Sequence, residues 1–104
     1  MATRATIKIE GINEMKVYKH WDGNPASTLP WLESFNESFT KGRGTDSAYK
    51  IAQLLRSSIN DAKEFNLDGN LQTGWGLVPY SEDCGAEFEY ELLNNGKVTV
   101  KELN

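Results

Sequence analysis

The stretch from Val17 to Pro25 contains the side chains best suited to chemistry. It places the single histidine of the chain, His20, directly before Trp21 and Asp22. A histidine can serve as a general base near neutral pH, and a nearby carboxylate can orient it or bind a cation. The Gly-Asn-Pro sequence that follows is also typical of a strand that runs into a tight turn. Three interpretations stay open: a structural turn, which we favour, a ligand contact and a catalytic site.

Aromatic residues and a glycine-rich segment could complete a binding pocket around this stretch. Trp75 lies between two glycines, which would let a ligand approach closely. Residues 40–46 lead into a helix start, where free N–H groups favour anions, although a connector between helices explains them more simply. The pocket would hold a small anionic or nucleotide-like ligand. Its predicted ligand-binding residues are Tyr18, His20, Trp21, Asp22, Arg43 and Trp75.

Carboxylates gather in the C-terminal third of the chain. The predicted partner-binding residues are Glu82, Asp83, Glu87, Glu89 and Glu91. Such a face could dock on a basic protein, although alternating glutamates on an outward strand face are usually a solvated surface. Cys84 lies among these acids, which disfavours its thiolate, so we do not interpret it as a nucleophile.

Composition argues against several classes of function. The chain of 104 residues has a net charge of −4 and scattered lysines and arginines, whereas nucleic-acid binding normally needs a basic patch. A single histidine excludes a multi-histidine metal site, zinc spacings are absent, and no Walker motif is present. We expect no metal, no cofactor and no catalytic triad.

The chain also lacks the marks of a membrane or secreted protein. No apolar run approaches the roughly 20 residues of a membrane span, and no secretory signal is readable at the N-terminus. The lone cysteine cannot form an internal disulfide and fits a reducing compartment. These features predict a cytoplasmic protein.

Period-two alternation predicts two N-terminal strands. Residues 3–11 and 14–20 each alternate between apolar and polar side chains. A hairpin loop at 11–13 would place Ile7 opposite Val17 in the pair.

A first helix should follow. Ser27 or Thr28 would cap it, Pro30 would lie in its first turn, and the glycines at 42 and 44 would end it. Its predicted apolar stripe, at spacings of three and four, is Leu29, Leu32, Phe35 and Phe39.

A second, longer helix should begin after Thr45 or Asp46 as its cap and close at the turn residues 68–70. Its predicted buried stripe is Ala48, Ile51, Ala52, Leu55, Ile59 and Ala62.

Three C-terminal strands complete the pattern. Residues 74–80 predict a short edge strand because Pro79 cannot donate to a ladder. Residues 86–92 alternate most clearly, and residues 97–103 form their partner. A three-residue loop at 94–96 keeps apolar residues together, since it predicts the pairs Leu92 with Val98, Tyr90 with Val100, and Glu89 with Lys101.

The resulting order, ββααβββ, predicts an α+β fold. We expect a two-layer sandwich in which two helices cover one face of an antiparallel sheet of about five strands. Residues 1–104 should form a single domain. Open sheet edges would allow a homodimer.

The segment VYKHWDGNP resembles the strand-and-turn signature Tyr-x-His-Trp-Asp-Gly-Tyr-Pro of small, largely uncharacterised bacterial and phage proteins. The matching residues are His20, Trp21, Asp22, Gly23 and Pro25. Asn24 departs from the usual tyrosine. The later GLVPYSEDCGAEFEYEL resembles the acidic strand that commonly ends these proteins. The resemblance implies a stand-alone module of mobile elements with a phage accessory or counter-defence role, and it implies no catalytic residue.

The sequence therefore favours a small non-enzymatic binding module that sequesters a nucleotide-like ligand. One alternative is an acidic, anti-CRISPR-like inhibitor that docks on a basic protein of a nucleic-acid-handling host complex. The other is a small hydrolase that uses His20 and Asp22.

Overall fold

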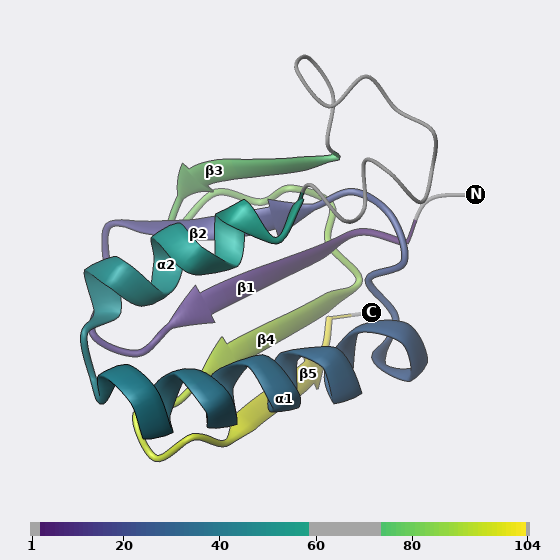
Figure 1. The fold of residues 1–104 in the computed structure, drawn as a ribbon. Coiled ribbons are helices and arrows are strands. Elements are labelled where there is room, and N and C mark those ends of the chain that lie inside the picture. Colours follow the sequence, from purple (N-terminus) through teal and green to yellow (C-terminus); the bar gives the residue numbers. More distant parts are fainter. Residues whose placement is uncertain (1–2, 59–73, 104) are drawn as a thin grey trace.

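A computed structural model describes residues 3–58 and 74–103 of the chain. Its elements are β1 (Ala5–Ile9), β2 (Met15–Lys19), α1 (Pro25–Arg43), α2 (Ser47–Arg56), β3 (Trp75–Pro79), β4 (Phe88–Leu92) and β5 (Val98–Glu102) (Figure 1). This is the predicted order ββααβββ, and the α+β class is confirmed.

The five strands form one sheet in the order β3-β2-β1-β4-β5. Three of the four pairings are antiparallel, but β1 and β4 run parallel at the centre. The sheet is therefore mixed, and the prediction of a wholly antiparallel sheet is wrong at this pairing. Because β1 and β3 are both antiparallel to β2, β4 also runs parallel to β3, the strand that precedes it in the chain. Residues 80–87 therefore carry the chain back along the sheet from the end of β3 to the start of β4.

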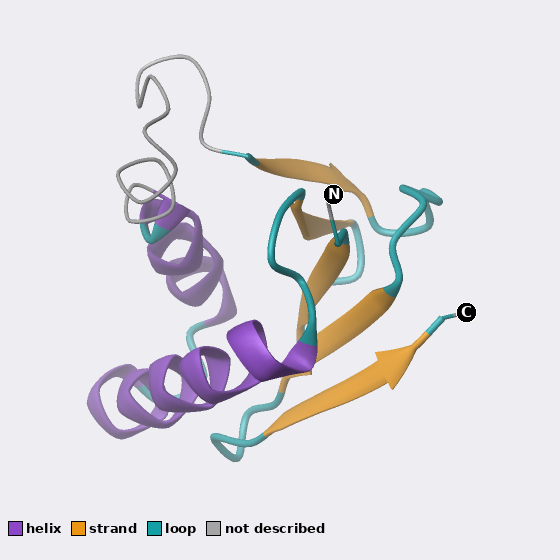
Figure 2. Cartoon of the chain, turned by 90° about the vertical axis from the view of Figure 1, so that its right-hand side faces the viewer, coloured by secondary structure: helices purple, strands orange, loops and turns teal. Residues whose placement is uncertain are grey.

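The two faces of the sheet are covered differently. Both helices pack on one face, with α1 against β4 and β5 and α2 against β1 (Figures 1 and 2). Residues 80–87, which we call the crossover, pass over the opposite face on their way from β3 to β4. None of the helices in the described ranges is long and apolar enough to cross a membrane.

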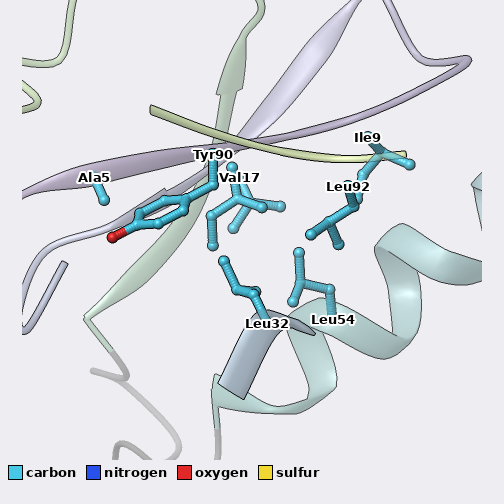
Figure 3. Close-up of a cluster of buried hydrophobic side chains, with 8 residues drawn as sticks. Ala5, Ile9, Val17, Leu32, Leu54, Tyr90 and Leu92 are labelled. Carbon is cyan, nitrogen blue, oxygen red and sulfur yellow. The ribbon is translucent and has the colours of Figure 1, made fainter. Parts of the chain in front are cut away.

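The hydrophobic core lies between the sheet and the helices. Figure 3 shows side chains of β1, β2 and β4 meeting Leu32 of α1 and Leu54 of α2. The buried cluster is Ala5, Ile7, Ile9, Val17, Leu32, Leu54, Tyr90 and Leu92. Each fully buried Leu, Ile or Val stabilises the fold by about 1.5–3 kcal/mol, so the predicted alternation determines which face of the sheet meets the helices.

The predicted strand registers are confirmed. Ile7 pairs with Val17 in the first hairpin. In the last one, the pairs are Leu92 with Val98, Tyr90 with Val100, and Glu89 with Lys101. Gly96 has a φ of +91°, the left-handed conformation that the three-residue loop requires.

The first helix begins earlier than predicted. Asn24 is its N-cap, because the Asn24 side chain accepts from the amide of Ser27, and Pro25 occupies the first helical position. Pro30 consequently lies beyond the first turn. The Pro30 nitrogen has no hydrogen, so it cannot donate to the carbonyl of Ala26. Ala26 is exposed, so water can donate a hydrogen bond to that carbonyl instead.

The buried stripe of the second helix is confirmed in part, because the predicted Ile51 and Leu55 pack against the core. Asp46 caps it as expected, but its buried residues are Lys50 and Leu54, whereas Ala48 and Ala52 are exposed. The long aliphatic stem of a lysine can fill a core position that alanine cannot. Predictions for Ile59, Ala62 and the turn at 68–70 lie outside the described residues.

Candidate functional site

His20 lies just beyond β2, on the sheet face that the helices leave free. Its backbone amide donates to the carbonyl of Gly74, and its Nδ1 is 2.7 Å from the hydroxyl of Tyr18. Residues two apart in a strand share a face, so Tyr18 and His20 point the same way. Tyr18, rather than Asp22, is thus the residue that orients the imidazole.

Trp21 and Asp22 shape the turn that follows. A side chain at Gly74 would overlap the Trp21 ring, so glycine at that position lets the indole lie on the backbone. Asp22 has a φ of +54°, and its carbonyl accepts from the Thr28 hydroxyl at 2.5 Å. These contacts support the interpretation of the stretch as a structural turn.

The remaining predicted ligand residues lie elsewhere. Trp75 pairs with Lys19, which alternates with Tyr18, so its indole is on the helix-covered face, 5.8 Å from the Trp31 ring. Arg43 ends α1, roughly 27 Å from the start of that helix at 1.5 Å per residue. Its guanidinium lies 4.0 Å from the centre of the Tyr49 ring. The structure brings Tyr18, His20 and Trp21 together, but not Trp75 or Arg43 with them.

The predicted acidic residues do share one region, at the crossover and the free face of β4. Glu82 and Asp83 are exposed in the crossover, and Glu89 and Glu91 alternate outward on β4. This region is not purely negative, because Glu89 forms an ion pair with Lys8 at 3.2 Å. Burial alone would lower the pKa of Lys8, but the contributions of Glu89 and, to a smaller extent, Tyr80 together outweigh burial and raise it.

A pocket of about 470 Å³ lies between the crossover and the sheet. Residues 82–86 form one side of it, and Leu103 lies at its edge. Thr6 of β1, Lys16 of β2 and Glu89 of β4 form the other side. We call this the crossover pocket.

Thr6 is the most deeply buried polar residue of the pocket lining, with 1% of its surface exposed. In the sheet it pairs with Tyr18 on one side and Glu89 on the other. Its Oγ1 is buried and finds no hydrogen-bond partner among the described residues. A buried hydroxyl without a partner costs about 1–3 kcal/mol, and native proteins rarely leave one unexplained.

Lys16 and Cys84 meet at one backbone carbonyl of the crossover. The Lys16 ammonium donates to the Glu82 carbonyl at 2.7 Å, and the Cys84 thiol contacts the same oxygen at 3.8 Å. Burial raises the pKa of the Cys84 thiol; Lys16 opposes this rise, and the charges of Glu82 and Asp83 add to it. Near neutral pH the thiol is therefore protonated and a weak nucleophile, as expected from its acidic neighbours.

Sequence reasoning did not identify this pocket. Thr6 and Lys16 are ordinary polar positions of alternating strands, and only the course of the crossover brings them to Glu82 and Cys84. Within residues 3–58 and 74–103, no group of three or more His, Cys, Asp or Glu side chains is placed to hold a metal ion. The pocket chemistry is therefore that of hydroxyl, ammonium, carboxylate and thiol groups.

Comparison with known proteins adds no relative: no family model, no curated protein and no solved structure matches this chain.

Proposed function

We propose that the protein is a non-enzymatic binding module that holds a small polar ligand in the crossover pocket. The observation that carries this proposal is the Thr6 hydroxyl, which is buried in the pocket lining and has no partner in the described part of the chain. A bound ligand would supply that partner. The site thus differs from the one that the sequence suggested, while the kind of function is the same.

The dimensions and chemistry of the pocket support this function. Its volume lies within the range of about 300–1,000 Å³ typical of small-molecule sites. Thr6 comes from β1, Lys16 from β2 and Glu89 from β4, so three neighbouring strands hold these groups in fixed relative positions. Polar groups on paired strands orient a ligand more rigidly than groups on a loop.

Binding is better supported than catalysis. Cys84 carries a protonated thiol, and His20 is not among the residues that line the pocket. Asp22 takes part in the turn through its backbone carbonyl, which accepts from Thr28. The hydrolase alternative therefore has no geometric support from these contacts.

The acidic-inhibitor alternative has weaker support. A docking face for a basic partner would need unneutralised carboxylates, yet Lys8 and Glu89 already form an ion pair and Lys101 pairs with Glu89 across the last hairpin. Of the predicted set, only Glu82 and Asp83 are exposed; Glu87, Glu89 and Glu91 are partly buried. The phage accessory or counter-defence role stays a prediction from the resemblance.

The proposal is tested by thermal-shift measurements on a panel of small amines, amino acids, sugars and nucleotides. Thr6→Val keeps the β-branched shape and removes only the hydroxyl, and Thr99→Val makes the same change at an exposed position of β5. A specific ligand at about 100 times its Kd should stabilise the wild type by about 2.7 kcal/mol. We expect such a compound to act on wild type and Thr99→Val, and weakly on Thr6→Val.

Two results would overturn the proposal. One is a flat response of the wild-type protein across the whole panel. The other is a stabilising compound that raises the melting temperature of Thr6→Val as much as that of Thr99→Val. Without ligand, Thr6→Val should fold at least as stably as wild type, because the substitution removes an unpartnered buried hydroxyl, so a folding failure would not confuse the comparison.

A further inference from the structure

We propose that the ligand of the crossover pocket carries a protonated amine or a guanidinium group. This inference depends on the proposed function, since it names the chemical class that the same pocket would bind. It departs from the anionic or nucleotide-like ligand that the sequence suggested.

The charges of the pocket lining favour a cation. Three carboxylates line it, from Glu82, Asp83 and Glu89, against one ammonium, from Lys16. Lys8 neutralises Glu89 from outside the lining. The Arg4 guanidinium lies against Gly85 and is a second cation beside the crossover, but the lining residues themselves include more acidic than basic side chains.

The hydrogen-bonding capacity of the pocket points the same way. Lys16 already donates to the Glu82 carbonyl at 2.7 Å, and Lys8 already donates to Glu89 at 3.2 Å. The acceptors left to a ligand include the lone pairs of Thr6 Oγ1, the Glu82 carboxylate and the Asp83 oxygen that does not accept from the Gly85 amide. An ammonium or guanidinium has only donors and matches this set, whereas a phosphate would bring further acceptors.

Cys84 provides a reporter for this inference, because it lines the pocket and is the only cysteine of the chain. Its thiol can exchange with a symmetric disulfide: the old S–S bond breaks, a mixed disulfide forms, and the second half leaves as a free thiol that takes the proton. Cystamine, bis(2-hydroxyethyl) disulfide and 3,3′-dithiodipropionic acid would attach groups of similar length with positive, zero and negative charge.

The measurement is the equilibrium constant of each mixed disulfide, read by intact-mass spectrometry at fixed thiol-to-disulfide ratio. A capped peptide of residues 82–86 has the same neighbouring acids without the pocket and serves as the reference. Thr6→Val tests the dependence on the hydroxyl, with Thr99→Val as the matched control. We expect the folded protein to favour the aminoethyl adduct over the carboxyethyl adduct by about tenfold more than the peptide does.

The outcomes separate the ligand class from the binding function. If the folded protein favours the hydroxyethyl or carboxyethyl adduct over the peptide, and Thr6→Val removes that preference, the pocket binds small ligands but the cationic class is wrong. If no adduct is favoured by the folded protein over the peptide, both the class and the proposed function are wrong. A preference for the aminoethyl group that Thr6→Val weakens, and Thr99→Val does not, supports both.

Discussion

Lys50 is the most unusual buried residue of the structure. Its side chain is 0% exposed, and its Nζ finds no hydrogen-bond partner in the described ranges. The ammonium lies 5.4 Å from the centre of the Phe39 ring. Burial lowers the pKa of Lys50, and the charge of Glu10 only partly opposes this effect. The fold therefore disfavours the charged form of this amine.

We predict that Lys50→Met stabilises the protein. Methionine has a similar length and can fill the same space without an amine that needs a partner. The free energy of unfolding at pH 7 should rise by about 1–3 kcal/mol in urea denaturation. Lys41→Met, at an exposed position of α1, is the control and should change little. A less stable Lys50→Met variant would show that the amine has a stabilising contact.

The same residue gives a pH dependence with a defined sign. Because the folded-state pKa is lowered from 10.5, the unfolded chain binds the proton more readily than the native state. Wild-type stability should therefore rise with pH from the lowered pKa up to about 10.5, relative to Lys50→Met. Urea denaturation of both proteins between pH 6 and pH 10 measures this difference, and parallel curves would contradict the assignment.

Tyr90 of β4 forms a hydrogen bond that links the turn after β2 to the centre of the sheet. Its hydroxyl donates to the carbonyl of Gly23 at 2.5 Å, and the side chain is fully buried. Tyr90→Phe would leave that carbonyl without its partner, so we predict a loss of about 1–3 kcal/mol in the free energy of unfolding. Tyr49→Phe, at an exposed site, should lose much less. Equal effects in urea denaturation would refute the anchoring role.

Burial raises the pKa of Tyr90 to about 12, and the neighbouring Thr28 side chain opposes this rise in part. The unfolded tyrosine has a pKa of 10.0, so the native state retains the proton longer. Its contribution to stability is full below about pH 10 and is lost as pH rises through about 12. The tyrosinate absorbance of the wild type should include a step near pH 12 that Tyr90→Phe lacks.

At the scale of elements, Asn24 has a clear physical role where the resembling proteins usually have tyrosine. Its side chain accepts from the amide of Ser27 at 3.3 Å and starts α1. Asn24→Ala should cost about 1 kcal/mol of stability, whereas Ser27→Ala should cost much less because Ser27 is not the cap. Urea denaturation of the two variants checks this, and the reverse order would restore Ser27 as the cap.

The sequence correctly predicted the strands that turn one apolar face toward the core between sheet and helices. In β1 and β4, a shift of one residue would expose Ile7 or Tyr90, so periodicity alone determines the face. The burial of Lys50 escaped prediction because a lysine scores as polar, although its stem packs like an apolar chain. The start of α1 was missed because Asn24 belongs to the turn motif as well as to the helix.

The candidate site could not be predicted from the sequence for a topological reason. Alternation in β4 does not reveal whether its neighbour runs parallel or antiparallel, and only the parallel pairing with β1 requires the crossover. The crossover then brings Glu82 to Lys16, 66 positions away in sequence. The sequence drew attention to Glu82, Asp83 and Glu89 as acids, but Thr6 and Lys16 look like ordinary strand residues until these segments meet.

At the scale of the whole molecule, the sheet separates the apolar core from the proposed binding pocket. Its helix-covered face carries the apolar core, and its other face carries Thr6, Lys16 and Glu89 beneath the crossover (Figure 2). Substitutions on the second face can therefore change binding without removing core contacts. This separation is what allows Thr6→Val to serve as a test of the pocket.

The most direct test of the account is a map of amide NMR shifts for the wild-type protein titrated with small fragments, including guanidinium, ethylenediamine and imidazole. The account predicts that saturable shifts gather at Thr6, Lys16 and residues 82–89. Shifts that gather instead at residues 18–22, with the crossover unchanged, would contradict it and return the binding site to the histidine turn.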